Sequence, residues 1–221
     1  MLKMLLFVAV GMAIAAAIAS VISRRKKEEA DRREARERAV TGANVTNDIT
    51  GVGKGGVLRL PPFGKNRLPI ETYVKTRHRY QEPDGGAPWY ELVCEHGKRE
   101  LIVEWSREGG ELYITAGYED ENPRIEDLGL DEPRLIEFDE SQRGAFEWDG
   151  QKWHYVESGE RLYFADDGRE RDGFYCWEFQ SDDESRNLTI EKWQGDRKFH
   201  VYHLWMVDAR SVEVYDAGEG K

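Results

Sequence analysis

Four glutamates recur at matching places in two stretches of the chain: Glu91, Glu104, Glu178 and Glu191. Carboxylates that come together can act as a general acid and base, bind cations, or pair with Arg or Lys side chains on neighbouring strands. Glycosidase-like chemistry needs a separation of about 5 to 9 Å, which sequence spacing does not fix. Cross-strand ion pairs are the simplest expectation, binding of a polyamine or a partner protein is the functional hypothesis, and catalysis is the alternative.

The other residue types that do chemistry form no recognisable site. The histidines are His78, His96, His154, His200 and His203. His200 and His203 lie three residues apart, which places them on opposite faces of a strand. The only cysteines, Cys94 and Cys176, lack the close C-x-x-C spacing of a metal or redox site, so we expect free thiols. We therefore expect no catalytic residue, no metal and no cofactor.

The charge of the chain limits its partners. The formal net charge is -11, and the residues beyond Arg38 carry 23 basic against 38 acidic side chains. Such a surface repels phosphate backbones, so we expect no nucleic acid as a partner. It suits cations, polyamines and basic proteins, although negative charge also keeps a domain soluble without any partner.

A repeat defines the elements that carry the four glutamates. Residues 89–93 read Trp-Tyr-Glu-Leu-Val, and residues 176–180 read Cys-Trp-Glu-Phe-Gln. Leu101 and Leu188 follow at the same distance, so the two stretches align at an offset of 87 residues without a gap. After Leu101, apolar residues alternate between the two faces of an extended chain, which is typical of a strand.

This repeat predicts a duplicated β domain over residues 51–216, with a first copy at 64–116 and a second copy at 149–204. A short sheet alone buries too little surface to be stable. We therefore expect two related antiparallel sheets that pack as a sandwich or as paired partial barrels around one shared core. Residues 135–138 and 145–148 are expected to be the strands that open the second copy, and no helix longer than a few residues is expected in this domain.

An uncharged stretch of 19 residues, Met4–Ile22, precedes the β domain. As a helix it spans roughly 28 Å, close to a hydrocarbon core of about 30 Å. The membrane-proximal bases that follow it are Arg24, Arg25, Lys26 and Lys27. Only Lys3 precedes it, so the positive-inside bias predicts a transmembrane helix over 1–23 with the rest of the chain in the cytoplasm.

The rival interpretation is a signal peptide that is cleaved after Ala17-Ile18-Ala19. The apolar run continues past that site to Ile22, and the dense bases after it would resist export, so we expect the helix to be retained. Charge pairs at i,i+4 predict a juxtamembrane helix over 24–39. A small, polar linker at 40–50 then leads into the β domain, and 217–221 form a tail.

The strand and turn residues together resemble a known family. The pattern comprises Gly51–Leu60, Tyr73, Val74, Tyr80, Trp89–Leu92, Trp153–Val156, Trp177–Phe179 and Leu188–Trp193. It resembles the bacterial Domain of Unknown Function 4178 over residues 51–215. Members of that family resemble accessory proteins, often encoded beside small membrane proteins, phage-shock-like membrane-stress factors and polyamine-synthesis enzymes. The resemblance implies an envelope-associated accessory role and supplies no catalytic residues.

The sequence therefore predicts a mainly-β, single-pass protein of the bacterial inner membrane whose C-terminal domain faces the cytoplasm. It would touch lipid through residues 4–22 and bind a partner protein, a second copy of itself or a polyamine. Such an adaptor would be non-catalytic, and the resemblance links it to membrane stress. The alternatives are a carboxylate-based hydrolase and a structural subunit of a larger membrane assembly.

Overall fold

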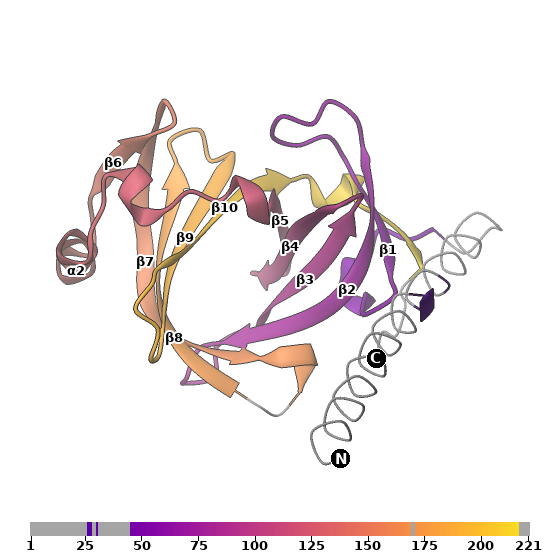
Figure 1. Ribbon diagram of the computed structural model, residues 1–221, viewed down its shortest axis with the longest axis horizontal. Coiled ribbons are helices and arrows are strands. Elements are labelled where there is room, and N and C mark those ends of the chain that lie inside the picture. The colour runs from indigo at the N-terminus through magenta and orange to yellow at the C-terminus, as the bar shows by residue number, and fades with distance from the viewer. Residues whose placement is uncertain (1–25, 28–29, 31–44, 169–170, 217–221) are drawn as a thin grey trace, which may run out of the picture. The chain divides into compact units, whose positions relative to one another are not determined.

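The computed structural model describes residues 26–27, 30, 45–168 and 171–216 (Figure 1). Contacts divide the chain into two units, residues 1–43 and 44–221, and the fold described below is that of the second unit. The predicted span Met4–Ile22 and the bases Arg24 and Arg25 lie outside the described residues, whereas Lys26 and Lys27 are helical and exposed. No helix in the described part of the chain is long and apolar enough to cross a membrane.

Eleven strands form the sheet of the second unit. They are β1 (Val57–Leu60), β2 (Ile70–Gln81), β3 (Trp89–His96), β4 (Arg99–Glu108), β5 (Glu111–Tyr118), β6 (Ala145–Trp148), β7 (Gln151–Phe164), β8 (Arg171–Ser181), β9 (Arg186–Trp193), β10 (His200–Val207) and β11 (Glu213–Asp216). The helical elements are α2 (Glu132–Ser141) and the short 3-10 helices η1 (Ile49–Gly51), η2 (Glu119–Glu121), η3 (Ile125–Leu128), η4 (Ala165–Asp167) and η5 (Ala209–Ser211).

The sheet is partly closed into a ring. The strand order is β11-β1-β2-β3-β4-β5-β10-β9-β8-β7-β6, and β2 also pairs with β7, which joins eight strands in a cycle. Every pairing is antiparallel, and the closing contact consists of three residue pairs between 79–81 and 162–164. The prediction of a mainly-β, antiparallel domain is confirmed, but the strands belong to one sheet and not to two packed sheets.

The two long strands at the closure, β2 and β7, each pair with two different strands along one edge, in addition to β3 or β8 on the other edge. β2 has 12 residues and pairs with β1 near its start and with β7 at its end. β7 has 14 residues and pairs with β6 near its start and with β2 at its end. The register of each shifts midway, between Val74 and Thr76 in β2 and between Tyr155 and Glu157 in β7. Such bulges bend a strand, which lets it leave one partner and reach the other.

The apolar core is divided, in contrast to the single shared core that we expected. One buried cluster, which includes Leu92 and Val103, lies among β1 to β5, β11 and the segment around η1. A second cluster lies among β7 to β10 and α2, and includes Trp153 and Phe179. Most of these side chains lie on the strand faces that point away from the ring, because neighbours along the strands, such as Glu104 beside Val103, line its interior. Trp105 and Phe179 belong to the clusters and also border the cavity.

Residues 135–138, predicted as a strand, lie in helix α2. The Asp131 side chain accepts a hydrogen bond from the backbone N–H of Arg134, and Pro133 occupies the first turn. Both features begin helices. Leu135 and Phe138, three residues apart, share the face that is buried in the second cluster. The prediction that the domain has no helix of this length is therefore wrong, whereas residues 145–148 do form a strand, β6.

Candidate functional site

The four recurring glutamates face the interior of the ring. Glu91 lies directly opposite Glu104, which lies opposite Thr115. Residues directly opposite one another in an antiparallel pair share a face of the sheet. On the other half of the ring, Glu178 lies on β8 and Glu191 on β9, and both line the same cavity as Glu104. The sequence repeat thus brings its glutamates together from opposite walls.

The two halves differ in register, although their sequences align without a gap. Glu91 pairs with Glu104, but Glu178 pairs with Thr189, and Glu191 pairs with Cys176. β3 and β4 are joined by a two-residue turn, whereas the turn between β8 and β9 is longer. This difference displaces Glu178 from Glu191 by two residues along the strands, whereas equal registers would have placed them directly opposite one another.

The cavity inside the ring has a volume of about 540 Å³. Its lining includes six glutamates and two arginines, a formal excess of four negative charges among the described residues. Aromatic side chains share the wall, among them Trp89 and Phe174. Phe174 belongs to a small buried cluster with Tyr80 and Cys176 at the closure between β2 and β7. The ring therefore encloses an acidic space with an aromatic end.

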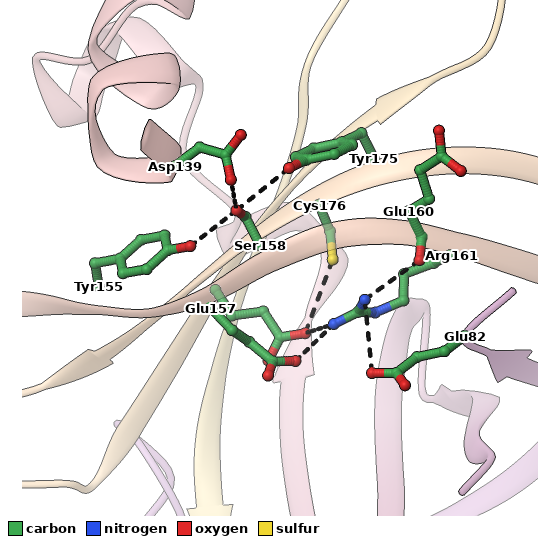
Figure 2. Close-up of polar contacts among 10 residues, drawn as sticks. Glu82, Asp139, Tyr155, Glu157, Ser158, Glu160, Arg161, Tyr175 and Cys176 are labelled. Atoms are coloured by element: carbon green, nitrogen blue, oxygen red, sulfur yellow. Dashed lines mark hydrogen bonds and ion pairs between the residues drawn. The ribbon is translucent and has the colours of Figure 1, made fainter. Parts of the chain in front are cut away.

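Three of these carboxylates surround one buried guanidinium, and we call them the arginine-partner glutamates: Glu82, Glu157 and Glu178. Arg161 on β7 lies within 2.6 Å of Glu157 Oε1, 3.6 Å of Glu178 Oε1 and 3.8 Å of Glu82 Oε1. Figure 2 shows Arg161 between Glu82 and Glu157, with the backbone carbonyl of Glu160 also accepting a hydrogen bond. The Arg161 side chain is only 6% exposed, whereas its three partners are 36–52% exposed.

Two neighbouring residues accommodate this guanidinium, one by packing against it and the other by leaving space for it. Trp89 lies beneath it, with its ring centre 5.4 Å from the Arg161 Cζ atom. Gly159, two residues earlier on β7, leaves space, because a β-carbon there would lie 2.8 Å from Arg161 Nη1. The Arg161 Nε atom is buried and has no hydrogen-bond partner in the described part of the chain.

A second set has uncharged neighbours, and we call its members the neutral-partner glutamates: Glu104 and Glu191, which line the cavity, and Glu91, which lies opposite Glu104. The sixth glutamate of the lining, Glu108, belongs to neither set. Glu191 Oε2 accepts a hydrogen bond of 2.7 Å from the indole N–H of Trp193. Tyr80 lies near Glu91 and Thr115 near Glu104, and each of these hydroxyl groups lowers the pKa of its glutamate. Among residues 45–168 and 171–216, none of the three has an Arg or Lys ion-pair partner. Of the four recurring glutamates, only Glu178 has the cross-strand cationic partner that we expected, and that partner is Arg161.

Burial in the ring makes these carboxyl groups weak acids. It raises the pKa of Glu91 to about 7 and that of Glu191 to about 8, although Tyr80 and Trp193 oppose these shifts. Burial also raises the pKa of Glu104 well above its ordinary value, and repulsion by Glu91, Glu191 and Glu178 adds to the shift. The set therefore holds protons near neutral pH, and a bound cation would displace them.

Glu178 is shifted as well, although it lies beside Arg161. Burial raises the pKa of Glu178 to about 7, and repulsion by Glu157 adds to the shift, while Arg161 opposes it. The Cys176 thiol donates to Glu178 Oε1 at 3.8 Å. Burial raises the pKa of Cys176 well above its ordinary value, so this thiol is a poor nucleophile.

The remaining candidates form no second site. Cys94 and Cys176 are both free and buried, as predicted. His203 is buried and His200 is partly exposed, in line with their predicted positions on opposite faces of β10. Where the structure describes the chain, no three His, Cys, Asp or Glu side chains are placed to hold a metal ion.

Sequence reasoning missed Arg161 and a second polar cluster on the other face of β7. In that cluster the Ser158 hydroxyl donates to Asp139 of α2 and lies 2.8 Å from the Tyr155 hydroxyl and 3.4 Å from that of Tyr175 (Figure 2). The cluster ties α2 to β7 and β8. The spacing Gly159-x-Arg161 is the only local signal for the buried arginine, because a glycine in a strand interior often marks a close approach.

An antiparallel ring around an acidic cavity defines the structural class of this protein. The family model of a domain of unknown function (DUF4178) matches residues 70–208, which is more than half of the chain. The chain belongs to this family, as the resemblance predicted. The match runs from the first residue of β2 to just beyond β10, so it includes all eight strands of the ring. No curated protein and no solved structure matches the chain.

Proposed function

We propose that this protein is a membrane-anchored, non-catalytic accessory module whose ring binds an organic polycation, a polyamine. The observation that carries the proposal is the gathering of Glu104, Glu178 and Glu191 in one cavity, where glutamates outnumber arginines six to two. Carboxylates attract ammonium groups, and aromatic faces such as that of Trp89 attract cations and pack against methylene chains. A volume of about 540 Å³ accommodates a small organic ligand.

A polyamine suits this cavity better than a metal ion does. Calcium takes about six to eight oxygen ligands within about 2.6 Å, which requires several carboxylates at one point. The cavity instead carries its carboxylates in two sets, one around Arg161 and one on β3, β4 and β9. Ammonium groups spaced along a flexible chain match carboxylates that are spaced in the same way.

The membrane attachment in this proposal rests on the sequence. Met4–Ile22 would span the bilayer, and the bases at 24–27 would hold the ring at the cytoplasmic face, where anionic lipids and basic partner proteins are found. A reporter fused after Lys221 tests this orientation. Activity of a cytoplasmic reporter is expected, and activity of a periplasmic reporter alone would overturn it.

We also propose that the ring arose by internal duplication. β1 to β5 and β6 to β10 each form a run in which consecutive strands pair. A bulge lies close to the corresponding Tyr-Val pair in each half, directly after Val74 in β2 and at Val156 in β7. Gene duplication followed by pairing of the two halves at β5–β10 and β2–β7 explains both features.

Calorimetric titration of the full-length chain in a non-ionic detergent tests the binding proposal. We expect saturable, equimolar binding of 1,4-diaminobutane at pH 7 and low salt, and at least tenfold weaker binding of butylamine, which carries one ammonium group. Glu104→Gln should weaken diamine binding at least tenfold, whereas Glu140→Gln, on an exposed position of α2, should leave it unchanged. Absence of saturable binding, or equal effects of the two substitutions, would refute the proposal.

One observation favours a second candidate, a carboxylate-based hydrolase. Glu178, whose pKa burial raises to about 7, lies beside Glu157, which is ion-paired to Arg161. A protonated and an ionised carboxyl group in one cavity can serve as general acid and base. Release of aryl alcohol from aryl glycosides by the full-length chain, and its loss in Glu178→Gln, would favour hydrolysis. No release from any glycoside of the panel would count against it.

A structural subunit of a membrane assembly is the remaining alternative from the sequence. The molecular mass of the chain in detergent, measured by light scattering, separates it from a lone tethered module. A stable complex with other proteins that persists in Glu104→Gln and forms without any amine would favour the structural role.

A further inference from the structure

Arg161 is a cation that the fold itself places in the acidic cavity. Its side chain is 6% exposed and faces three carboxylates at 2.6 to 3.8 Å. Burying a guanidinium is costly unless it is paired, so this position is maintained by its glutamate partners. Within the described part of the chain, no Arg or Lys is ion-paired with the neutral-partner glutamates, of which Glu104 and Glu191 line the same cavity.

The contacts of Arg161 are those that an ammonium group of a ligand would make. Trp89 lies 5.4 Å from its Cζ atom, as in a cation–aromatic contact, and Glu157 and Glu178 supply the carboxylates. The Nε atom is buried and without a partner among the described residues. A guanidinium placed only to complete a hydrogen-bond network would satisfy this donor, so its hydrogen bonds alone do not explain the position.

We propose that Arg161 is a specificity-determining residue that occupies the place of one ligand ammonium group, so that the cavity selects a linear diamine over longer polyamines. This inference rests on the proposed binding of polyamines. One ammonium group of the diamine would bind the neutral-partner glutamates, and the other would share the arginine-partner glutamates with Arg161. A third ammonium group would meet the guanidinium and be repelled by it.

The repulsion lets the cavity discriminate against amines that carry more than two ammonium groups. Specificity often comes from an element that disfavours the wrong ligand more than from one that favours the right ligand. Without Arg161, general electrostatic attraction would favour the amine with more charges. A tethered cation repels the third ammonium group in addition to the second, so it weakens binding of the longer amine more than binding of the diamine.

Calorimetry with 1,4-diaminobutane and with the triamine spermidine tests the inference on the full-length chain in detergent. Arg161→Met keeps a long side chain and removes the charge, so it should strengthen spermidine binding at least tenfold and strengthen diamine binding by a clearly smaller factor, about threefold. Arg161→Lys should keep the wild-type preference. Arg143→Met, at an exposed position between α2 and β6, removes the same charge elsewhere and should change both affinities equally and weakly.

The outcomes separate this inference from the proposed function. If neither amine binds the wild-type chain, the proposed function fails. If both bind and Arg161→Met changes them by the same factor, only the role of Arg161 is overturned. Should Arg161→Met unfold at the temperature of the titration, Arg161→Gln, which can still donate to Glu157, carries the same expectation.

Discussion

The two sets of glutamates in the ring occupy one cavity but differ in what balances their charge. The arginine-partner set, Glu82, Glu157 and Glu178, is 36–52% exposed and surrounds a guanidinium. In the neutral-partner set, Glu91 and Glu191 are buried and Glu104 is half-buried, and the neighbouring polar groups are uncharged, such as the Trp193 indole that donates to Glu191. A buried carboxylate without a cation is costly, so the second set retains protons or awaits a cation from outside.

The neutral-partner glutamates are therefore where we expect a ligand cation to bind, and their position in the fold supports this. A fold that needed only stability would place apolar residues at these interior positions, since replacing buried charge by apolar side chains is often neutral or stabilising. The outward faces of the same strands do carry such residues, for example Leu92 beside Glu91 and Val103 beside Glu104. The interior glutamates lower the stability of the fold, so we infer that they are present because they have a function.

The largest expected effect comes from removing both charges on facing walls of the ring. The double variant Glu104→Gln/Glu191→Gln should weaken diamine binding at least 100-fold, because each lost carboxylate removes a charge-assisted hydrogen bond worth roughly 1.5–3 kcal/mol. Glu178→Gln should weaken it less than tenfold, since Arg161 already balances Glu178. Titration calorimetry measures both. Equal losses would erase the distinction between the two sets.

The second effect concerns stability and pH. The pKa of Glu191 is about 8 in the folded chain and near 4.5 when unfolded, so its contribution is present at low pH and is lost as pH rises through about 8. The free energy of unfolding should therefore fall between pH 6.5 and 8. Glu191→Gln should flatten this fall and raise stability at pH 8 by on the order of 2 kcal/mol.

Urea unfolding of the wild type and Glu191→Gln at several pH values measures this difference. The comparison cancels the titration of histidines such as His203, since both proteins contain them. Glu140→Gln is the surface control and should retain the wild-type slope. A wild-type stability that rises over this pH range would contradict the protonation that we assign to the neutral-partner set.

The third expected effect is the release of protons from the glutamates when the diamine binds. Because a bound ammonium group favours ionised carboxylates, diamine binding at pH 7 should release about one proton, mainly from the neutral-partner glutamates. Titrations in buffers of different ionisation enthalpy report the number released. The double variant Glu104→Gln/Glu191→Gln, studied at higher ligand concentration, should release close to none. Proton uptake would point to a different site.

The smallest expected effect comes from moving Arg161 without removing it. A β-carbon in Gly159→Ala would meet the end of the Arg161 side chain at 2.8 Å and push the guanidinium aside. Spermidine binding should strengthen about three- to fivefold, less than in Arg161→Met. Gly173→Ala is the matched control, because its β-carbon would make only ordinary contacts near 3.9 Å. Identical behaviour of the two alanine variants would argue against a role for the Arg161 position.

Part of the site could be predicted from the sequence. The strands around Glu91, Glu104, Glu178 and Glu191 follow from alternation and from the repeat, because both depend on local spacing. That these glutamates face one another depends on closure of the ring through three residue pairs between β2 and β7, segments that are far apart in the chain. No local pattern encodes such a pairing.

Other features were missed for identifiable reasons. Residues 135–138 are a short apolar run, which periodicity alone cannot assign to a strand or a helix, and the helix signals at Asp131 and Pro133 decide the question. Arg161 lies beyond the bulge at Tyr155, where the alternation of faces shifts by one residue. Its direction into the ring therefore does not follow from simple alternation along β7.

The central claim is that the neutral-partner glutamates bind a ligand ammonium group inside the ring. A crystal structure of the protein grown with 1,4-diaminobutane tests it most directly. We expect one nitrogen of the diamine within about 3 Å of Glu104 and Glu191 oxygens, with Arg161 still beside Glu157. A diamine bound only on the outer surface, with water filling the ring, would contradict it.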